Sequence, residues 1–124
     1  MNNSLEVSPT AAHTMIQKGA LLVDVREPHE VARKAFDVPD IMLIPLRELK
    51  TRFHEIPVNR QVIIACHVGN RGSMAIRFLI SQGYSKAVNM QQGIVRWEKE
   101  GLPLVKRQEQ SAGSWLKQIF STKS

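Results

Sequence analysis

Two short, almost wholly apolar runs constrain the fold of this chain more than any other feature. They occupy residues 21–25 (LLVDV) and 62–65 (VIIA), with Asp24 as the one charged residue. Strands of this composition are typical of a parallel sheet that is covered on both faces. Similar apolar stretches at residues 41–44 and 87–89 predict further strands.

Helix signals alternate with these strands. Helices are predicted over residues 9–18, 27–33, 46–53, 73–82 and 94–99. Pro9 after Ser8 marks one helix start, and Gly83 marks the end of the helix that follows the second apolar strand. This alternation predicts an α/β fold with a mostly parallel central sheet and helices on both of its faces.

Chain length and composition fit one folded domain with a short extension. The chain has 124 residues, of which 43% are hydrophobic, and this suits a single globular core. We expect the domain to span residues 1–105 and a basic, partly amphipathic tail to span residues 106–124. For the apolar stripe of that tail, a short helix that docks on its own domain or frays is favoured over a helix that binds a membrane or a partner.

Charge and targeting signals narrow the partners. The net charge is +6, shared evenly between body and tail, and no dense Lys and Arg cluster with interleaved aromatic residues occurs. A nucleic-acid partner is therefore not expected, and a small anionic substrate fits better. The sequence shows no signal peptide and no apolar run near the ~20 residues that cross a bilayer, so a cytoplasmic protein is expected.

The single cysteine stands where the second apolar strand ends. Cys66 follows residues 62–65 directly, and with no second cysteine the chain forms no internal disulfide or dithiol cycle. Ligands bind beyond the carboxyl ends of the strands in open parallel sheets. A helix predicted to begin near Gly72 and Ser73 would turn its free amides toward this loop and favour the thiolate form of the cysteine.

The loop after Cys66 supplies further groups for an anion. Gly69 permits a backbone turn in which successive amides point inward, and Arg71 offers a permanent charge with a forked donor for an oxyanion. An ordinary buried thiol is the alternative interpretation. The combination of Cys, Gly and Arg between a strand and a helix favours a nucleophilic cysteine.

These residues resemble a known family. The segment Cys66-His-Val-Gly69-Asn-Arg71 is similar to the C-x-x-G-x-R active-site loop of the rhodanese superfamily. Three further segments are similar to family signatures in the same order, namely residues 24–28 (DVREP), 44–49 (IPLREL) and 92–97 (QGIVRW). The resemblance covers residues 5–105 and implies a single rhodanese-like domain.

The resemblance implies a sulfurtransferase. Cys66 would take a sulfane sulfur from thiosulfate or a persulfide and pass it to cyanide or to a thiol, carried by a small molecule or an acceptor protein. The implied substrate-binding residues are the five that follow the nucleophile: His67, Val68, Gly69, Asn70 and Arg71. The residues expected to support the site are Asp24, Gly72 and Ser73. Neither a metal nor another cofactor is expected.

Two other functions stay open. A phosphatase or arsenate-handling enzyme would use the same cradle, but the six residues from Cys66 through Arg71 resemble the sulfur-transferring members of the superfamily. Phosphatase relatives carry one residue more. A non-catalytic rhodanese-like interaction module is the third hypothesis, and it does not need Cys66, Gly69 and Arg71 together.

Four other residues have competing interpretations. His67 either guides an anion or points away from the nucleophile. Asp24 is expected to accept hydrogen bonds from loop or helix backbone, and Arg26 to be exposed among its acidic neighbours rather than to line the pocket. Trp97 is expected in the core rather than as a platform for substrate.

Overall fold

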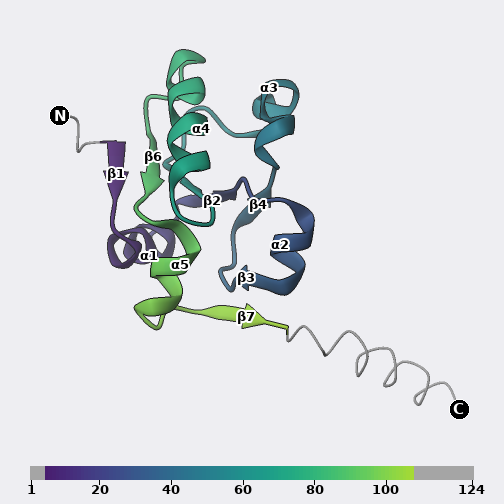
Figure 1. Ribbon diagram of the computed structural model, residues 1–124. Helices are drawn as coiled ribbons and strands as arrows, with labels where there is room; N and C mark the ends of the chain where they lie inside the picture. Colours follow the sequence, from purple (N-terminus) through teal and green to yellow (C-terminus); the bar gives the residue numbers. More distant parts are fainter. Residues whose placement is uncertain (1–4, 108–124) are drawn as a thin grey trace, which may run out of the picture.

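A five-stranded parallel sheet forms the centre of the computed structural model, which describes residues 5–107 (Figure 1). Its strands, in the spatial order β1-β6-β5-β2-β4, are β1 (Glu6–Val7), β6 (Ala87–Met90), β5 (Val62–Ala65), β2 (Leu21–Asp24) and β4 (Ile41–Leu43). All four pairings are parallel. The predicted α/β fold with a mostly parallel sheet is confirmed.

Helices connect the strands and cover the sheet. They are α1 (Pro9–Gln17), α2 (Pro28–Arg33), α3 (Leu49–Arg52), α4 (Asn70–Ser81) and α5 (Gly93–Lys99). Two short 3-10 turns, Leu46–Glu48 and Phe53–Glu55, flank α3, so the helix predicted over residues 46–53 is divided into three pieces. An antiparallel pair, β3 (Lys34–Phe36) with β7 (Leu104–Lys106), lies outside the main sheet and was not predicted.

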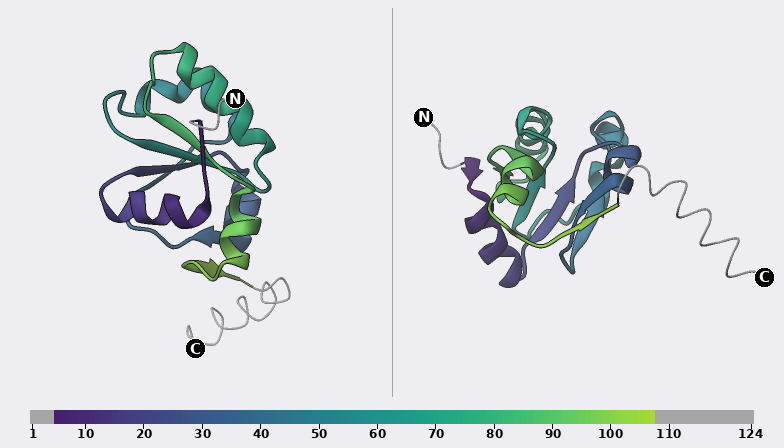
Figure 2. Two further views of the ribbon diagram at one scale, coloured as in Figure 1. Left: turned by 90° about the vertical axis from the view of Figure 1, so that its left-hand side faces the viewer. Right: turned by 60° about the horizontal axis from the view of Figure 1, so that its bottom comes forward.

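Alternate residues of the central strands build two separate cores. Leu21 and Val23 of β2 pack with α3 and α4, whereas Leu22 between them packs with α1 and α5. Figure 2 shows the sheet between α4 and α1. Side chains of a strand point to opposite faces in turn, and both faces are covered here. This arrangement is the physical reason for the almost wholly apolar composition of the two runs.

Trp97 lies in the core on the α1 and α5 side. Its side chain is fully buried, its indole N–H donates to the carbonyl oxygen of Pro103 at 2.8 Å, and its ring meets that of Phe36 edge to face. The prediction that this tryptophan serves packing is confirmed. No helix within residues 5–107 has the length and apolar character needed to cross a bilayer.

The boundary predicted between residues 105 and 106 falls inside β7, because Lys106 pairs with Lys34 of β3. Residues 108–124, and with them most of the predicted tail, lie outside the described residues. The docking of that tail stays a prediction.

Candidate active site

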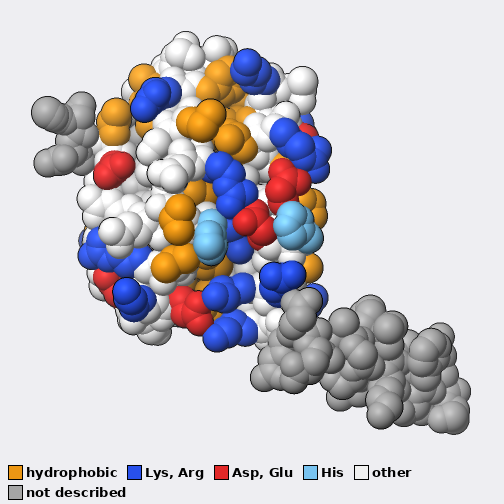
Figure 3. Space-filling view, in the orientation of Figure 1, with side chains coloured by type: hydrophobic (Ala, Val, Ile, Leu, Met, Phe, Trp, Pro, Cys, Tyr) orange, Lys and Arg blue, Asp and Glu red, His pale blue; other side chains and the backbone are white. Residues whose placement is uncertain are grey.

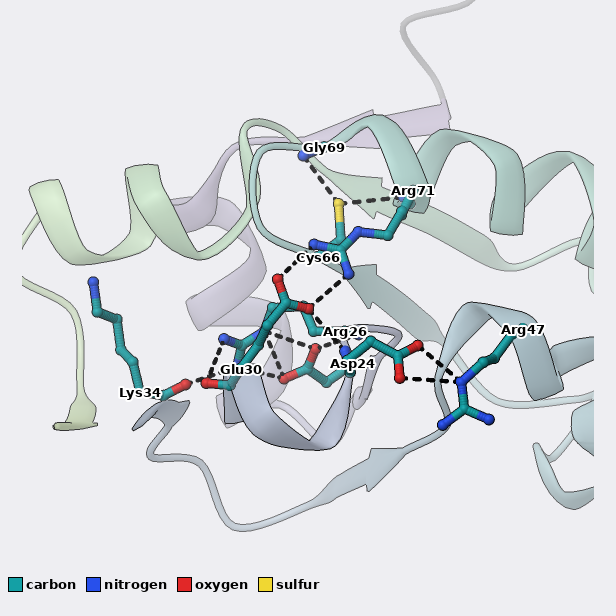
Figure 4. Close-up of polar contacts among 10 residues, drawn as sticks. Asp24, Arg26, Glu30, Lys34, Arg47, Cys66, Gly69 and Arg71 are labelled. Carbon is teal, nitrogen blue, oxygen red and sulfur yellow. Dashed lines mark hydrogen bonds and ion pairs between the residues drawn. The ribbon is translucent and has the colours of Figure 1, made fainter. Parts of the chain in front are cut away.

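Cys66 lies at the carboxyl end of β5, where the chain turns into α4. Its side chain is 1% exposed, and two backbone amides donate to its sulfur. The Sγ atom accepts from the Gly69 amide at 3.0 Å and from the Gly72 amide at 3.3 Å (Figure 4). Inward-facing amides of this kind form a concave site for a negative atom.

The helix after the loop begins earlier than expected. α4 starts at Asn70, three residues before the start predicted at Ser73, because Gly69 acts as its N-cap. Gly69 has φ 105°, a left-handed conformation that disfavours residues with a Cβ atom. The turn places the Gly72 amide, in the first turn of α4, within reach of the sulfur.

The carbonyl oxygen of Gly69 is held from two sides. It accepts the Ser73 amide at 3.0 Å and the Ser73 hydroxyl at 3.2 Å. From β6, the side-chain amide of Asn89 donates to the same oxygen at 3.4 Å. Ser73 and Asn89 thus hold the Gly69 carbonyl oxygen together, and Asn89 is a contact that the sequence did not single out.

Gly72 is a glycine because Asn89 leaves no room for a side chain. A Cβ atom at this position would lie 2.1 Å from Asn89 Oδ1 and 3.0 Å from its Cγ atom. That Oδ1 atom is buried and accepts no hydrogen bond from the described residues, which leaves it packed against the Gly72 backbone. Asn89 and Gly72 thus fix the approach of α4 to β6, and with it the direction of the Gly72 amide.

The start of α5 fixes the other side of the loop. The amides of Ile94 and Val95 donate to the carbonyl oxygens of Cys66 and His67 at 2.9 and 3.2 Å. A Cβ atom on Gly93 would lie 2.2 Å from the Cys66 oxygen, so only glycine permits this approach. With these carbonyls held by α5, the amides that follow are free to face the sulfur. This contact gives residues 92–97 a structural role at the site.

Arg71 extends from α4 to a carboxylate of α2. Its Nη1 and Nη2 atoms lie 2.7 and 2.9 Å from Oε1 and Oε2 of Glu30, in a bidentate ion pair. The hydrogen bond from Arg71 is the main cause that lowers the pKa of Glu30 to about 2, and the same bond raises the pKa of Arg71. The prediction placed Arg71 at the rim as a donor to substrate, and it did not foresee this partner.

A second arginine–carboxylate pair, Arg26 with Asp24, is more deeply buried than the first, and it corrects an expectation. Arg26 is 3% exposed and therefore buried, not exposed as predicted. Its Nη2 atom lies 2.8 Å from Asp24 Oδ2 and donates to the backbone oxygen of Lys34, and its Nη1 atom donates to the backbone oxygen of Glu30. Asp24 accepts the Arg26 amide at 3.1 Å, which confirms the expected bond to loop backbone. An acidic partner two residues away explains how this arginine is buried.

The remaining loop side chains face solvent. His67, Val68 and Asn70 are exposed, so the structure brings the loop backbone, rather than these side chains, to the sulfur. A groove of about 360 Å³ borders the loop. Its lining includes Val68, Asn70 and Ser73 from the loop and α4, and Gln91, Gln92 and Arg96 from the turn and helix that follow β6.

The sequence did not single out two residues that contact the candidate site, Glu30 and Asn89. Glu30 lies in the same acidic segment as Asp24. It is 41 residues from Arg71 in the sequence, so no local pattern predicts that the two residues pair. Asn89 is a polar residue at the end of a predicted strand, which is the one signal that marks it. Within residues 5–107, no group of three His, Cys, Asp or Glu side chains is placed to hold a metal ion.

The fold and this loop define a class of protein: an open parallel α/β domain with a cysteine in an amide cradle at the end of a central strand. Comparison with known proteins identifies the family. A model of the rhodanese-like domain matches residues 8–100, and the chain belongs to this family.

Individual relatives agree with this assignment. A sulfurtransferase of Allochromatium vinosum is 34% identical over 105 residues, covering 85% of this chain and 96% of the relative. The thiosulfate sulfurtransferase GlpE of Pseudomonas syringae is 26% identical over 97 residues, or 78% of this chain and 90% of that protein. The crystal structure of a rhodanese-related protein from Thermoplasma volcanium superimposes with a TM-score of 0.71 at 28% identity, covering 81% and 96% of the two chains.

Proposed function

We propose that this protein is a sulfurtransferase that moves a sulfane sulfur from thiosulfate or a persulfide to a thiophilic acceptor through a persulfide on Cys66. The observation that carries the proposal is the pair of amide hydrogen bonds to Sγ, 3.0 Å from Gly69 and 3.3 Å from Gly72. Donors fixed in the backbone stabilise negative sulfur without reorganising during the reaction.

The first half-reaction loads the cysteine. The Cys66 thiolate attacks the outer sulfur of the donor, a new S–S bond forms, and the bond between that sulfur and the rest of the donor breaks. With thiosulfate the leaving group is sulfite. With a persulfide R–S–SH the leaving group is the thiolate R–S⁻, which takes up the proton and departs as R–SH. In both cases Cys66 ends as a persulfide anion, whose terminal sulfur faces the amides of residues 67–71.

The second half-reaction unloads it. A thiolate or cyanide attacks the terminal sulfur, the Cys66 S–S bond breaks, and the cysteine returns as a thiolate while the acceptor becomes a persulfide or thiocyanate. The names of the relatives support this activity, since one is a sulfurtransferase and another a thiosulfate sulfurtransferase. A thiol on an acceptor protein meets the same chemical requirement as a small one.

Intact mass spectrometry tests the proposal, because the chain has one cysteine. Incubation with thiosulfate or a small persulfide is expected to add one sulfur to the wild-type protein, and cyanide to remove it. Cys66→Ala is the matched control and is expected to gain nothing. No adduct from either donor would contradict the proposal. Turnover of an aryl phosphate without sulfur loading would instead favour the phosphatase hypothesis.

A further inference from the structure

Arg71 and Glu30, 32% and 25% exposed beside the buried Cys66, form the edge of the site that we call its mouth. The guanidinium of Arg71 is already occupied there. Both of its terminal nitrogens face the carboxylate of Glu30, at 2.7 and 2.9 Å. Figure 4 shows this guanidinium between the sulfur of Cys66 and the Glu30 carboxylate. The two N–H groups that would grip an incoming oxyanion in a bidentate manner are thus used within the protein.

Glu30 is held in this position by its own helix. It lies in the first turn of α2, and its Oε1 atom accepts the backbone amide of Glu27 at 2.8 Å. Arg26 donates to the backbone oxygen of Glu30 from below, at 3.4 Å. The pKa of Glu30, lowered to about 2, keeps this carboxylate ionised at neutral pH. The negative charge is therefore a fixed feature of the mouth.

The nearby charges cancel. Arg71 is balanced by Glu30, and the buried Arg26 is balanced by Asp24. The groups that act electrostatically on Arg71 are Glu30, Cys66 and Asp24, all of which are acidic. On the face drawn in Figure 3, acidic and basic side chains interleave rather than form a broad basic patch. A thiolate on Cys66 then gives this group of residues a net negative charge.

Sulfur donors differ in how much negative charge they bring to such a site. Thiosulfate is a dianion, whereas a small persulfide carries at most one negative charge. We propose that Glu30 is a specificity-determining residue: by occupying Arg71 it biases the site against dianionic sulfur donors and toward persulfides. This inference rests on the proposed sulfurtransferase function, and it selects one of the two donor classes that the function allows.

Glu30→Gln tests the proposal, because glutamine keeps the shape and an acceptor for the Glu27 amide but removes the charge. The initial rate of persulfide formation on Cys66 is measured with thiosulfate and with 2-hydroxyethyl persulfide. The rate with thiosulfate is expected to rise about tenfold, as for removal of one like charge a few ångströms from a dianion. The rate with the persulfide is expected to stay within about twofold.

Glu27→Gln is the matched control. This glutamate precedes the same helix but pairs with Arg47, at 3.0 Å, instead of Arg71. Its removal is expected to leave the ratio of the two rates unchanged. The proposal would be overturned if Glu30→Gln changed the loading rates with both donors by the same factor. It would also be overturned if Glu27→Gln changed the ratio of the two rates as much as Glu30→Gln does. Either result would leave the proposed sulfur transfer intact. Absence of loading from both donors would overturn the proposal and the function together.

A second measurement needs no sulfur transfer. The single cysteine is alkylated with neutral iodoacetamide and with anionic iodoacetate, and the ratio of the two rates is compared with that of free glutathione. Wild type is expected to discriminate against iodoacetate several-fold, and Glu30→Gln to lose most of this discrimination. Wild-type and variant ratios that agree with each other would show that the carboxylate does not control entry of anions.

Discussion

Two arginine–carboxylate pairs, Arg26–Asp24 and Arg71–Glu30, differ in almost every physical respect. The Arg26–Asp24 pair is buried, with side chains 2% and 0% exposed, whereas the Arg71–Glu30 pair is 32% and 25% exposed. The buried pair is closed by backbone oxygens of Glu30 and Lys34. The partly buried Arg71–Glu30 pair borders the candidate site. The same two chemical groups are thus part of the core in one place and, in our proposal, set the electrostatics of the site in the other.

The difference follows from solvent. A charge that loses its partner inside the protein stays uncompensated, whereas water compensates a charge that loses its partner at the mouth. Removing either carboxylate therefore tests whether its pair stabilises the fold or affects sulfur transfer at Cys66.

Asp24→Asn is expected to have the largest effect on stability. It leaves the guanidinium of Arg26 buried beside a neutral group, which is expected to lower the free energy of unfolding by about 3–5 kcal/mol. Urea denaturation measures this loss. Glu30→Gln, the corresponding change in the exposed pair, is expected to cost about 1 kcal/mol. Equal losses in the two variants would remove the contrast between the pairs.

Gly72→Ala is expected to come next. Its Cβ would lie 2.1 Å from Asn89 Oδ1, an overlap expected to cost about 2–3 kcal/mol and to slow sulfur loading of Cys66 at least tenfold. Asn89→Ala removes the obstructing atom, so the double variant is expected to lose less stability than the two single variants combined. Additive losses, measured by urea denaturation of all three proteins, would show that the two residues do not oppose each other.

The Arg71–Glu30 pair is expected to make the free energy of unfolding depend on pH. The pKa of Glu30 is lowered from 4.5 to about 2, so its stabilising contribution is present above pH 4.5 and is lost as the pH falls toward 2. The expected difference between wild type and Glu30→Gln is about 1 kcal/mol at pH 7. Unfolding in urea at a series of pH values measures it. A difference that is constant from pH 7 to the lowest pH studied would contradict the assigned pair.

Gln92→Gly is expected to have the smallest effect, and it is stabilising. Gln92 has φ 58° and is the one non-glycine residue with positive φ among residues 5–107. Glycine relieves the left-handed strain but adds conformational freedom to the unfolded chain. The net result is expected to raise the free energy of unfolding by about 0.5–1 kcal/mol. Thermal unfolding measures the gain. A lower melting temperature for the variant would show that contacts of the Gln92 side chain outweigh the strain.

The parts of the fold that the sequence predicted are those with a local signal. β2 and β5 are apolar on both faces, and α1 has Pro9 at its start and Gly19 beyond its end. β3 and β7 have three residues each and pair across about 70 positions, so neither contains a pattern that predicts the other. Short strands of this kind are visible only once the chain is folded.

The same limit applies to the site. Cys66 and Gly69 could be singled out as candidates because their residue types and spacing lie together in one loop. Glu30 and Asn89, which contact Arg71 and the Gly69 carbonyl oxygen, come from α2 and β6, and only the fold brings them close to this loop. The burial of Arg26 was missed for a related reason. Arginine is usually exposed, and the sequence does not show that a carboxylate is buried beside this one.

A crystal structure of the persulfide-loaded protein tests the central claim most directly. The account predicts a second sulfur on Cys66 Sγ that lies within hydrogen-bond distance of the backbone amides of residues 67–71. A second sulfur that points away from these amides, toward side chains or bulk solvent, would contradict it.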